Sequence, residues 1–126
     1  MTEKIPVSIG ELWDKYSILL IKKEKISKSE KLIIVENEIN ILNENMNNYT
    51  WNESELFKKL KKINEKLWTI EDKLRIKECQ KQFDDEFIQL ARSVYYTNDM
   101  RAEIKGSINV HFNSNIHEVK DYVNYN

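Results

Sequence analysis

Apolar residues recur with helical spacing along most of the chain, most clearly between Asn52 and Cys79. There the intervals alternate between four and three residues, which places the apolar side chains in one seam along a helix and most lysines outside it. The pattern predicts a long core helix that begins at Glu53. Its seam consists of Leu56, Leu60, Ile63, Leu67, Ile70 and Leu74.

Two shorter helices are predicted before this one. Ser8 stands three residues before Glu11, a capping-box spacing that satisfies the first free amides of a helix. Ser27 and Glu30 repeat the spacing, so we expect a tight turn near Ile26 to Ser29 and an antiparallel hairpin. The two seams are formed by Ile9, Leu12, Trp13, Tyr16, Leu19, Leu20 and Ile26, and by Leu32, Val35, Ile39, Leu42 and Met46.

The pattern also predicts where helices end. The asparagine-rich run 43–52 is expected to be a loop, because asparagine side chains compete for backbone hydrogen bonds. After Leu74 the apolar positions shift roughly half-way round the helix, since each residue turns it by about 100°. We expect a break between Glu78 and Asp85, with Asp84 or Asp85 as the new cap, while one long helix that changes partners is the alternative. The second seam contains Ile76, Cys79, Phe83, Phe87, Leu90 and Val94.

The remaining chain completes a helical fold. A last helix starts at a cap within residues 97–99, or the preceding helix runs straight through. No glycine or proline occurs between Gly10 and Gly106, which favours helices throughout. We therefore expect an all-α antiparallel bundle of four to five helices with one long central helix, in a single domain over residues 1–126. The polar tail 113–126 is expected to be anchored by Val119, Tyr122 and Val123.

Composition and charge exclude several functions. A net charge of -1 and only three arginines argue against nucleic-acid binding. No apolar run approaches the roughly 18–20 residues that cross a bilayer, so we expect no membrane partner. The start of the chain lacks the apolar core of a signal peptide, and the single Cys79 cannot form an internal disulfide. The protein is interpreted as cytoplasmic, with Cys79 as a small buried apolar residue.

The densest group of polar side chains lies between Arg92 and Lys105. Helical spacing places Asn98, Arg101 and Lys105 on one face, where guanidinium, ammonium and amide groups could bind a phosphate, carboxylate or sugar. The alternative is a capped helix junction with half-buried tyrosines. The candidate ligand-binding residues here are Arg92, Tyr95, Asn98, Asp99, Arg101 and Lys105.

Further candidates lie on two other predicted helices. Arg75 could face a cavity, although its spacing from Glu71 also fits a surface ion pair. Asp14 and Lys15 could point into a polar pocket between helices, although Glu11 and Lys15 also form an ordinary surface pair. No metal site and no cofactor are expected, because the chain has no Glu-x-x-His pattern and no glycine-rich phosphate loop.

Several segments carry a family resemblance. They are Ile9-Gly10-Glu11-Leu12 with Asp14-Lys15 and Ile21-Lys22, Leu67-Trp68 with Ile70-Glu71-Asp72 and Arg75, Leu90 to Lys105, and Ile108-Asn109. Through them the whole chain resembles a family of small uncharacterised bacterial and phage proteins, a domain-of-unknown-function family. The chain departs from the family pattern at Gly106-Ser107 and Asn113-Ser114. The resemblance implies a helical fold over the whole length and no established activity. It also implies genes that neighbour those of surface-polysaccharide synthesis and sugar transfer, an associational hint.

Two hypotheses of function follow. The first is a non-enzymatic binding or adaptor protein that forms homo-oligomers or binds a protein partner through a helical face, because no catalytic constellation is recognisable. The second is an enzyme or binding protein for an anionic small molecule, such as a sugar phosphate or nucleotide sugar. Whether Arg75, Asp14 and Arg101 converge in one pocket distinguishes the two.

Overall fold

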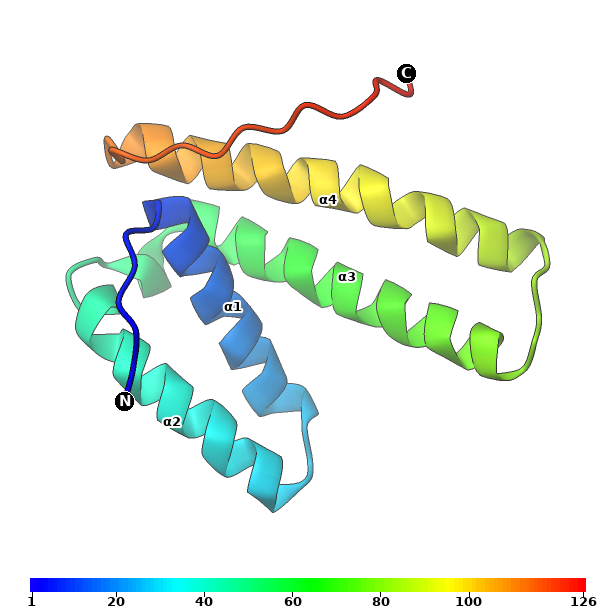
Figure 1. Ribbon diagram of the computed structural model, residues 1–126, viewed down its shortest axis with the longest axis horizontal. Helices are drawn as coiled ribbons and strands as arrows, with labels where there is room; N and C mark the ends of the chain where they lie inside the picture. Colours follow the sequence, from blue (N-terminus) through cyan, green and yellow to red (C-terminus); the bar gives the residue numbers. More distant parts are fainter.

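The computed structural model describes residues 1–126, which form four α-helices and no strand (Figure 1). This confirms the predicted all-α antiparallel bundle. The helices are α1 (Ile9–Lys25), α2 (Ser29–Met46), α3 (Glu55–Cys79) and α4 (Asp85–His111), with a short 3-10 helix η1 (Trp51–Glu53) before α3. None of the four is long and apolar enough to cross a membrane.

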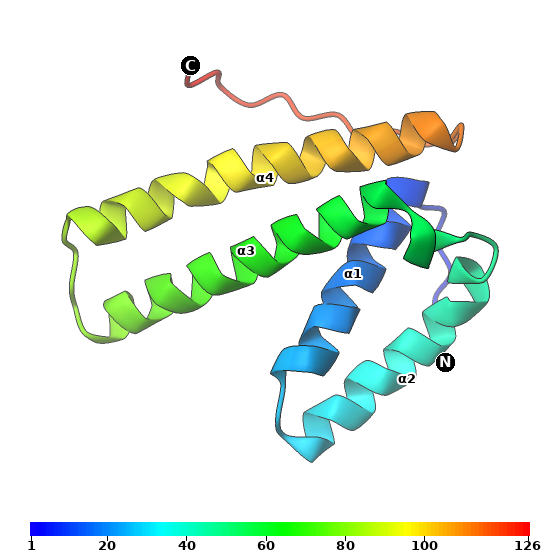
Figure 2. The same ribbon diagram turned by 180° about the vertical axis from the view of Figure 1, so that it is seen from behind.

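The helices form two antiparallel hairpins, α1–α2 and α3–α4. The hairpins meet where α1 begins and α4 ends, and they diverge from there (Figures 1 and 2). Helix α1 contacts each of the other three helices, so it joins the two hairpins. After α4 the chain turns back and runs along that helix toward the C-terminus (Figure 1).

Three side-chain caps set the helix starts. The backbone N–H groups of Glu11 and Phe87 donate to Ser8 Oγ at 3.0 Å and to an Asp84 carboxylate oxygen at 2.9 Å. Ser54 caps α3 in the same way. The predicted break between the two long helices is therefore confirmed, and Asp84 is the cap.

Other predicted boundaries were wrong in detail. The Ser27 capping box does not form, because α2 begins after Lys28 without a side-chain cap. Helix α2 also continues to Met46, so the predicted loop starts later than Asn43. Of the two alternatives for the last part of the chain, the uninterrupted helix is confirmed, since α4 runs through residues 97–99 and through Gly106.

The core lies where the hairpins meet. Aromatic side chains surround Trp13, whose ring centroid lies 5.8 Å from those of Tyr49 and Phe57 and 5.1 Å from that of Phe112. The predicted seams supply most of the other core residues. The central cluster consists of Trp13, Tyr16, Leu19, Val35, Ile39, Met46, Phe57, Leu60 and Ile108.

The predicted seam at the far end of the second hairpin is not buried. No residue between 71 and 96 is buried, since α3 and α4 there pack mainly against each other, with Tyr125 of the tail beside Tyr95 and Tyr96. We call these residues the α3–α4 arm. Cys79 is exposed, so its predicted burial was wrong. The predicted tail anchors Val119, Tyr122 and Val123 are also exposed, because polar contacts hold the tail instead.

Two glycines in helices provide a matched test of the contact between α1 and α4. A Cβ atom on Gly10 would lie 2.6 Å from the carbonyl oxygen of Lys105, whereas a Cβ atom on Gly106 would meet nothing within 4 Å. We expect Gly10→Ala to lower the free energy of unfolding by about 1–3 kcal/mol because the helices must separate. Gly106→Ala should raise it by up to about 1 kcal/mol. Urea unfolding measures both, and equal effects would contradict the close contact.

Candidate functional site

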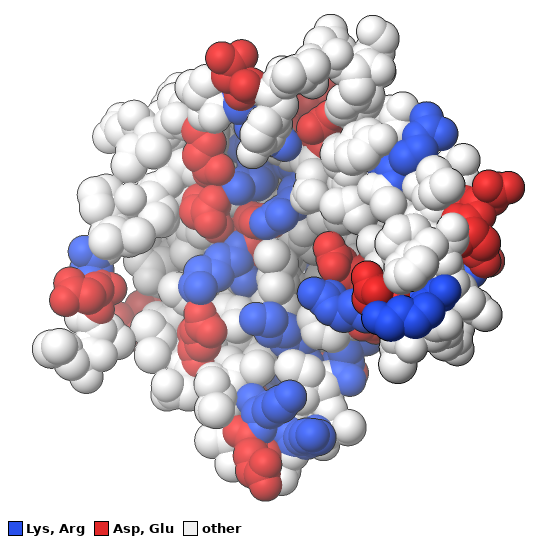
Figure 3. Space-filling view, turned by 45° about the vertical axis from the view of Figure 1, so that its right-hand side comes forward, with Lys and Arg blue, Asp and Glu red and all other residues white.

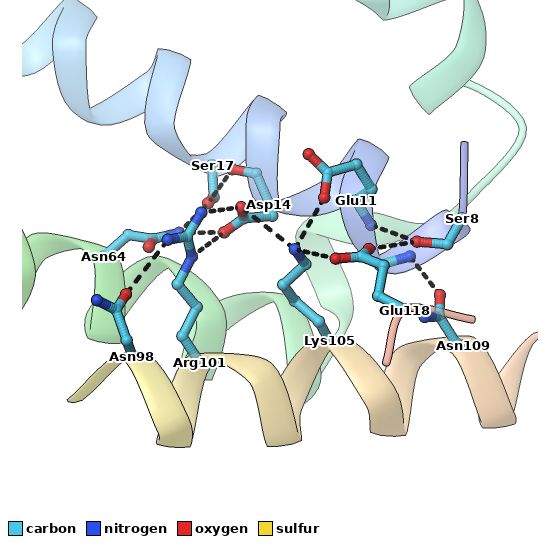
Figure 4. A network of polar contacts seen from close by, with 11 residues as sticks. Ser8, Glu11, Asp14, Ser17, Asn64, Asn98, Arg101, Lys105, Asn109 and Glu118 are labelled. Atoms are coloured by element: carbon cyan, nitrogen blue, oxygen red, sulfur yellow. Dashed lines mark hydrogen bonds and ion pairs between the residues drawn. The ribbon is translucent and has the colours of Figure 1, made fainter. Parts of the chain in front are cut away.

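A buried carboxylate lies at the junction of the two hairpins. Asp14 of α1 is 2% exposed and accepts hydrogen bonds from three donors, of which Asn64 Nδ2 and Arg101 Nε each lie 2.9 Å from its Oδ1. Arg101 Nη2 donates to the other carboxylate oxygen, which makes the ion pair bidentate. These bonds raise the pKa of the Arg101 guanidinium. The pair connects α1 to α4, and Asn64 connects both to α3 (Figure 4).

Lys105 extends this network one turn further along α4. Its Nζ lies 2.8 Å from a Glu11 carboxylate oxygen and 3.0 Å from one of Glu118. Burial lowers the pKa of Lys105, but the hydrogen bonds that it donates to Glu11 and Glu118 outweigh burial and the net shift is upward. Figure 4 shows Asn98, Arg101 and Lys105 in a row on α4, all directed toward α1. The predicted shared face of these three residues is therefore present.

Polar contacts hold the C-terminal segment, residues 114–126, against α4. The Ser8 hydroxyl donates to Glu118 at 3.0 Å, and Lys120 Nζ lies 3.3 Å from an Asp99 carboxylate oxygen. The Tyr125 hydroxyl also donates to Asp99, and this bond raises the pKa of Tyr125 to about 12. The segment thus forms one wall of a cavity above α4.

Three cavities share Arg101. The first, about 680 Å³, lies between α4 and the C-terminal segment, and we call it the tail cavity. The second and third, about 420 Å³ and 260 Å³, share both Ile18 and Arg101, and we call them together the hairpin cleft. Five predicted site residues line the tail cavity: Tyr95, Asn98, Asp99, Arg101 and Lys105.

The remaining predicted residues are more dispersed. Arg75 and Arg101 line the 420 Å³ part of the hairpin cleft, whereas Asp14 and Lys15 line the 260 Å³ part. Arg75, Asp14 and Arg101 therefore surround one cleft but not one cavity. The Lys15 side chain is more than half exposed and pairs with Glu38. Arg92 lines none of these cavities, and the hydrogen bonds that it donates to the side chains of Tyr95 and Tyr96 raise its pKa.

Six residues of the network were not predicted as site residues: Ser8, Glu11, Ser17, Asn64, Asn109 and Glu118. Asn64 and Ser17 lie on helices at the spacing of buried positions, as in Leu60-x-x-x-Asn64-x-x-Leu67, so the apolar pattern contained a signal for them. Asn109 and Glu118 gave no such signal. Asn109 Oδ1 accepts the Gly10 N–H at 2.7 Å, across a separation of 99 residues.

Charge in this region is balanced. Figure 3 shows lysine, arginine and acidic side chains interspersed over the face that contains the junction, without a large area of one sign. Arg101 and Lys105 both have carboxylate partners within the chain. No group of three or more histidine, cysteine or acidic side chains is placed to bind a metal ion. The arrangement offers paired hydrogen-bond donors and acceptors for polar recognition.

Acid is expected to release the C-terminal segment. Burial raises the pKa of Glu118, but hydrogen bonds from Lys105 and Ser8 bring it below the ordinary 4.5. The Tyr125 hydrogen bond likewise lowers the pKa of Asp99 below 3.8. A lowered folded-state pKa stabilises the contact above the ordinary value, and the stabilisation is lost as the pH falls through the folded-state pKa.

We therefore expect the amide signals of residues 115–126 to become those of a mobile chain as the pH falls below 4.5. NMR relaxation at a series of pH values measures this release. The variant with both Glu118→Gln and Asp99→Asn should show a mobile segment already at neutral pH. A segment that stays ordered in this variant would contradict the assignment of its contacts.

Comparison with family models gives a match over almost the whole chain. Comparisons with curated proteins and with solved structures found no match. Residues 3–125 match the model of a family of unknown function, DUF6165. Because this match covers almost the entire sequence, the protein belongs to that family.

Proposed function

We propose that the protein is a non-enzymatic binding protein that associates with a second copy through the α3–α4 arm and so acts as a helical adaptor. The main support is that no residue of the arm is buried, although the arm has apolar side chains. Ile76 and Ile88 are at least half exposed, and Phe83 in the connecting turn is 54% exposed. Two helices that pack only against each other bury little apolar surface, and a partner would bury more.

Charge complementarity favours a second copy as this partner. Asp84, Asp85 and Glu86 lie at the tip of the arm, where Lys77 pairs with Asp84 and Glu86 and leaves Asp85 without a basic partner. Lys73 and Arg92 lie nearer the base of the arm. Neither Arg92 nor Lys73 has an acidic partner within the chain. In an antiparallel, two-fold pairing of two arms, the acidic tip of each copy lies beside Lys73 and Arg92 of the other.

Sedimentation velocity tests this association. We expect the parent chain to be a dimer and the variant with both Ile76→Lys and Ile88→Lys to be a monomer, with a dissociation constant raised about 100-fold. Ile33→Lys on α2 is the matched control, since Ile33 is also exposed in a helix but lies outside the arm. A parent chain that is monomeric at every concentration, or equal effects of the arm and control variants, would refute the proposal.

A second candidate function is the binding of an anionic small metabolite, such as a sugar phosphate or nucleotide sugar, in the tail cavity. The observation that favours it is that five candidate side chains line this one cavity. Lys105 and Arg101 already have carboxylate partners, so an anion has to replace one of them. Glu118 is the replaceable partner, because it lies on a segment without secondary structure and its side chain is 46% exposed.

Thermal unfolding with sugar phosphates and nucleotide sugars tests this candidate. A compound at 100 times its dissociation constant should stabilise the chain by about 2.7 kcal/mol. Glu118→Gln should strengthen binding because it removes the competing carboxylate, and Lys105→Met should abolish it. If no compound stabilises the parent chain or the Glu118→Gln variant, the candidate fails.

A further inference from the structure

The larger part of the hairpin cleft is lined by Asn64, Leu67 and Trp68, which neither proposal uses. This cavity of about 420 Å³ lies between α1, α3 and α4 and is within the size range of small-molecule sites. It is separate from the tail cavity, although both include Asn98 and Arg101. Its lining residues are Ile18, Asn64, Leu67, Trp68, Glu71, Asp72, Arg75, Asn98 and Arg101.

A nearly buried amide provides a free acceptor in this cavity. Asn64 is 5% exposed, and its Nδ2 donates to Asp14 at 2.9 Å and to the Ser17 hydroxyl at 2.8 Å. Its Oδ1 accepts no hydrogen bond from the chain. Trp13 Nε1 is the single fully enclosed polar side-chain atom without a partner, so Asn64 Oδ1 is not fully enclosed. Because Asn64 lines the cavity, this oxygen is open to a ligand there.

Asn98 provides the matching donor. Its Oδ1 accepts from Arg101 Nη1 at 3.4 Å, and its Nδ2 donates to no residue of the chain. Asp72 adds a carboxylate without a basic partner, whereas Arg75 pairs with Glu71 at 3.2 Å. The cavity lining thus contains two acids and two arginines, so a ligand with a net charge gains little from it.

We infer that this cavity binds an uncharged sugar ring. A hydroxyl group both donates and accepts, so a ring of hydroxyls can satisfy Asn64 Oδ1, Asn98 Nδ2 and Asp72 together, which neither a pure donor nor a pure acceptor can do. The half-buried indole of Trp68 supplies apolar surface for the C–H side of the ring and an N–H for one oxygen. The cavity borders the base of the arm through Glu71, Asp72 and Arg75 and shares Asn98 and Arg101 with the tail cavity. The inference nevertheless requires neither proposal.

Indole N–H signals of the ¹⁵N-labelled full chain test the site. Trp68→Phe identifies the Trp68 signal among the three tryptophans. We then titrate the labelled chain with glucose, galactose, mannose and N-acetylglucosamine to about 50 mM. This range saturates a site whose dissociation constant is about 1 mM. We expect at least one sugar to shift the Trp68 signal saturably, with the signal of the buried Trp13 unchanged.

Two variants test whether the shift of the Trp68 signal comes from a sugar bound in this cavity. Asn98→Ala should raise the dissociation constant of the sugar that binds about tenfold, which is the effect of one lost hydrogen bond. Glu118→Gln, at the wall of the tail cavity, should leave it unchanged. The inference is overturned if no sugar shifts the Trp68 signal, if Asn98→Ala titrates like the parent, or if AMP shifts the signal while the sugars do not.

Discussion

Replacing Asp14 with alanine is expected to lower the free energy of unfolding by about 3–5 kcal/mol, because it leaves a half-buried guanidinium without its carboxylate. Asn64 Nδ2 also loses an acceptor in a buried position. The ordinary stability of a chain of this size is about 5–15 kcal/mol, so the variant should be near the limit of folding. Urea unfolding followed by circular dichroism gives the value.

The control for this variant is Asp72→Ala. Asp72 is also a helical aspartate, but it is exposed and has no basic partner. Its loss should change stability by less than about 0.5 kcal/mol. If Asp14→Ala unfolds at the same urea concentration as Asp72→Ala, the buried network does not hold the hairpins together.

Trp13→Ala is expected to lower the free energy of unfolding by a similar amount, about 3–5 kcal/mol, because it opens a cavity at the centre of the aromatic cluster. Trp13 is fully buried and contacts aromatic rings from the loop after α2, from α3 and from the end of α4. Thermal unfolding of Trp13→Ala beside Trp68→Ala measures the effect. Since Trp68 is only half buried, its variant should lose clearly less stability, and a reversed order would contradict the position of the core.

Helical periodicity predicted the fold because each helix buries one seam. The positions Leu60, Leu67 and Ile70 are buried as their spacing indicates, and the shift of the seam after Leu74 marks the true break. The same periodicity overestimated burial in the α3–α4 arm. A seam specifies which side of a helix is apolar, but a third element is needed to bury it, and the chain provides none there.

The candidate site could be predicted only in part. Spacing alone placed Asn98, Arg101 and Lys105 on one face, and the structure has them there. Spacing did not distinguish Asp14 from Lys15, although the Asp14 side chain is buried and the Lys15 side chain is exposed. The position of Glu118 depends on a chain reversal that brings it to Ser8, 110 residues away, and no local pattern specifies such a contact.

The coupling energy between Asp14 and Arg101 tests most directly whether this ion pair joins the hairpins. Unfolding free energies of Asp14→Asn, Arg101→Met and the double variant form a thermodynamic cycle that retains the shape of Asp14 and most of the apolar stem of Arg101. We expect a coupling of at least about 1 kcal/mol, since the pair is bidentate and its carboxylate is buried. Effects that add to within about 0.3 kcal/mol would contradict this account and leave Arg101 free to bind an anion directly.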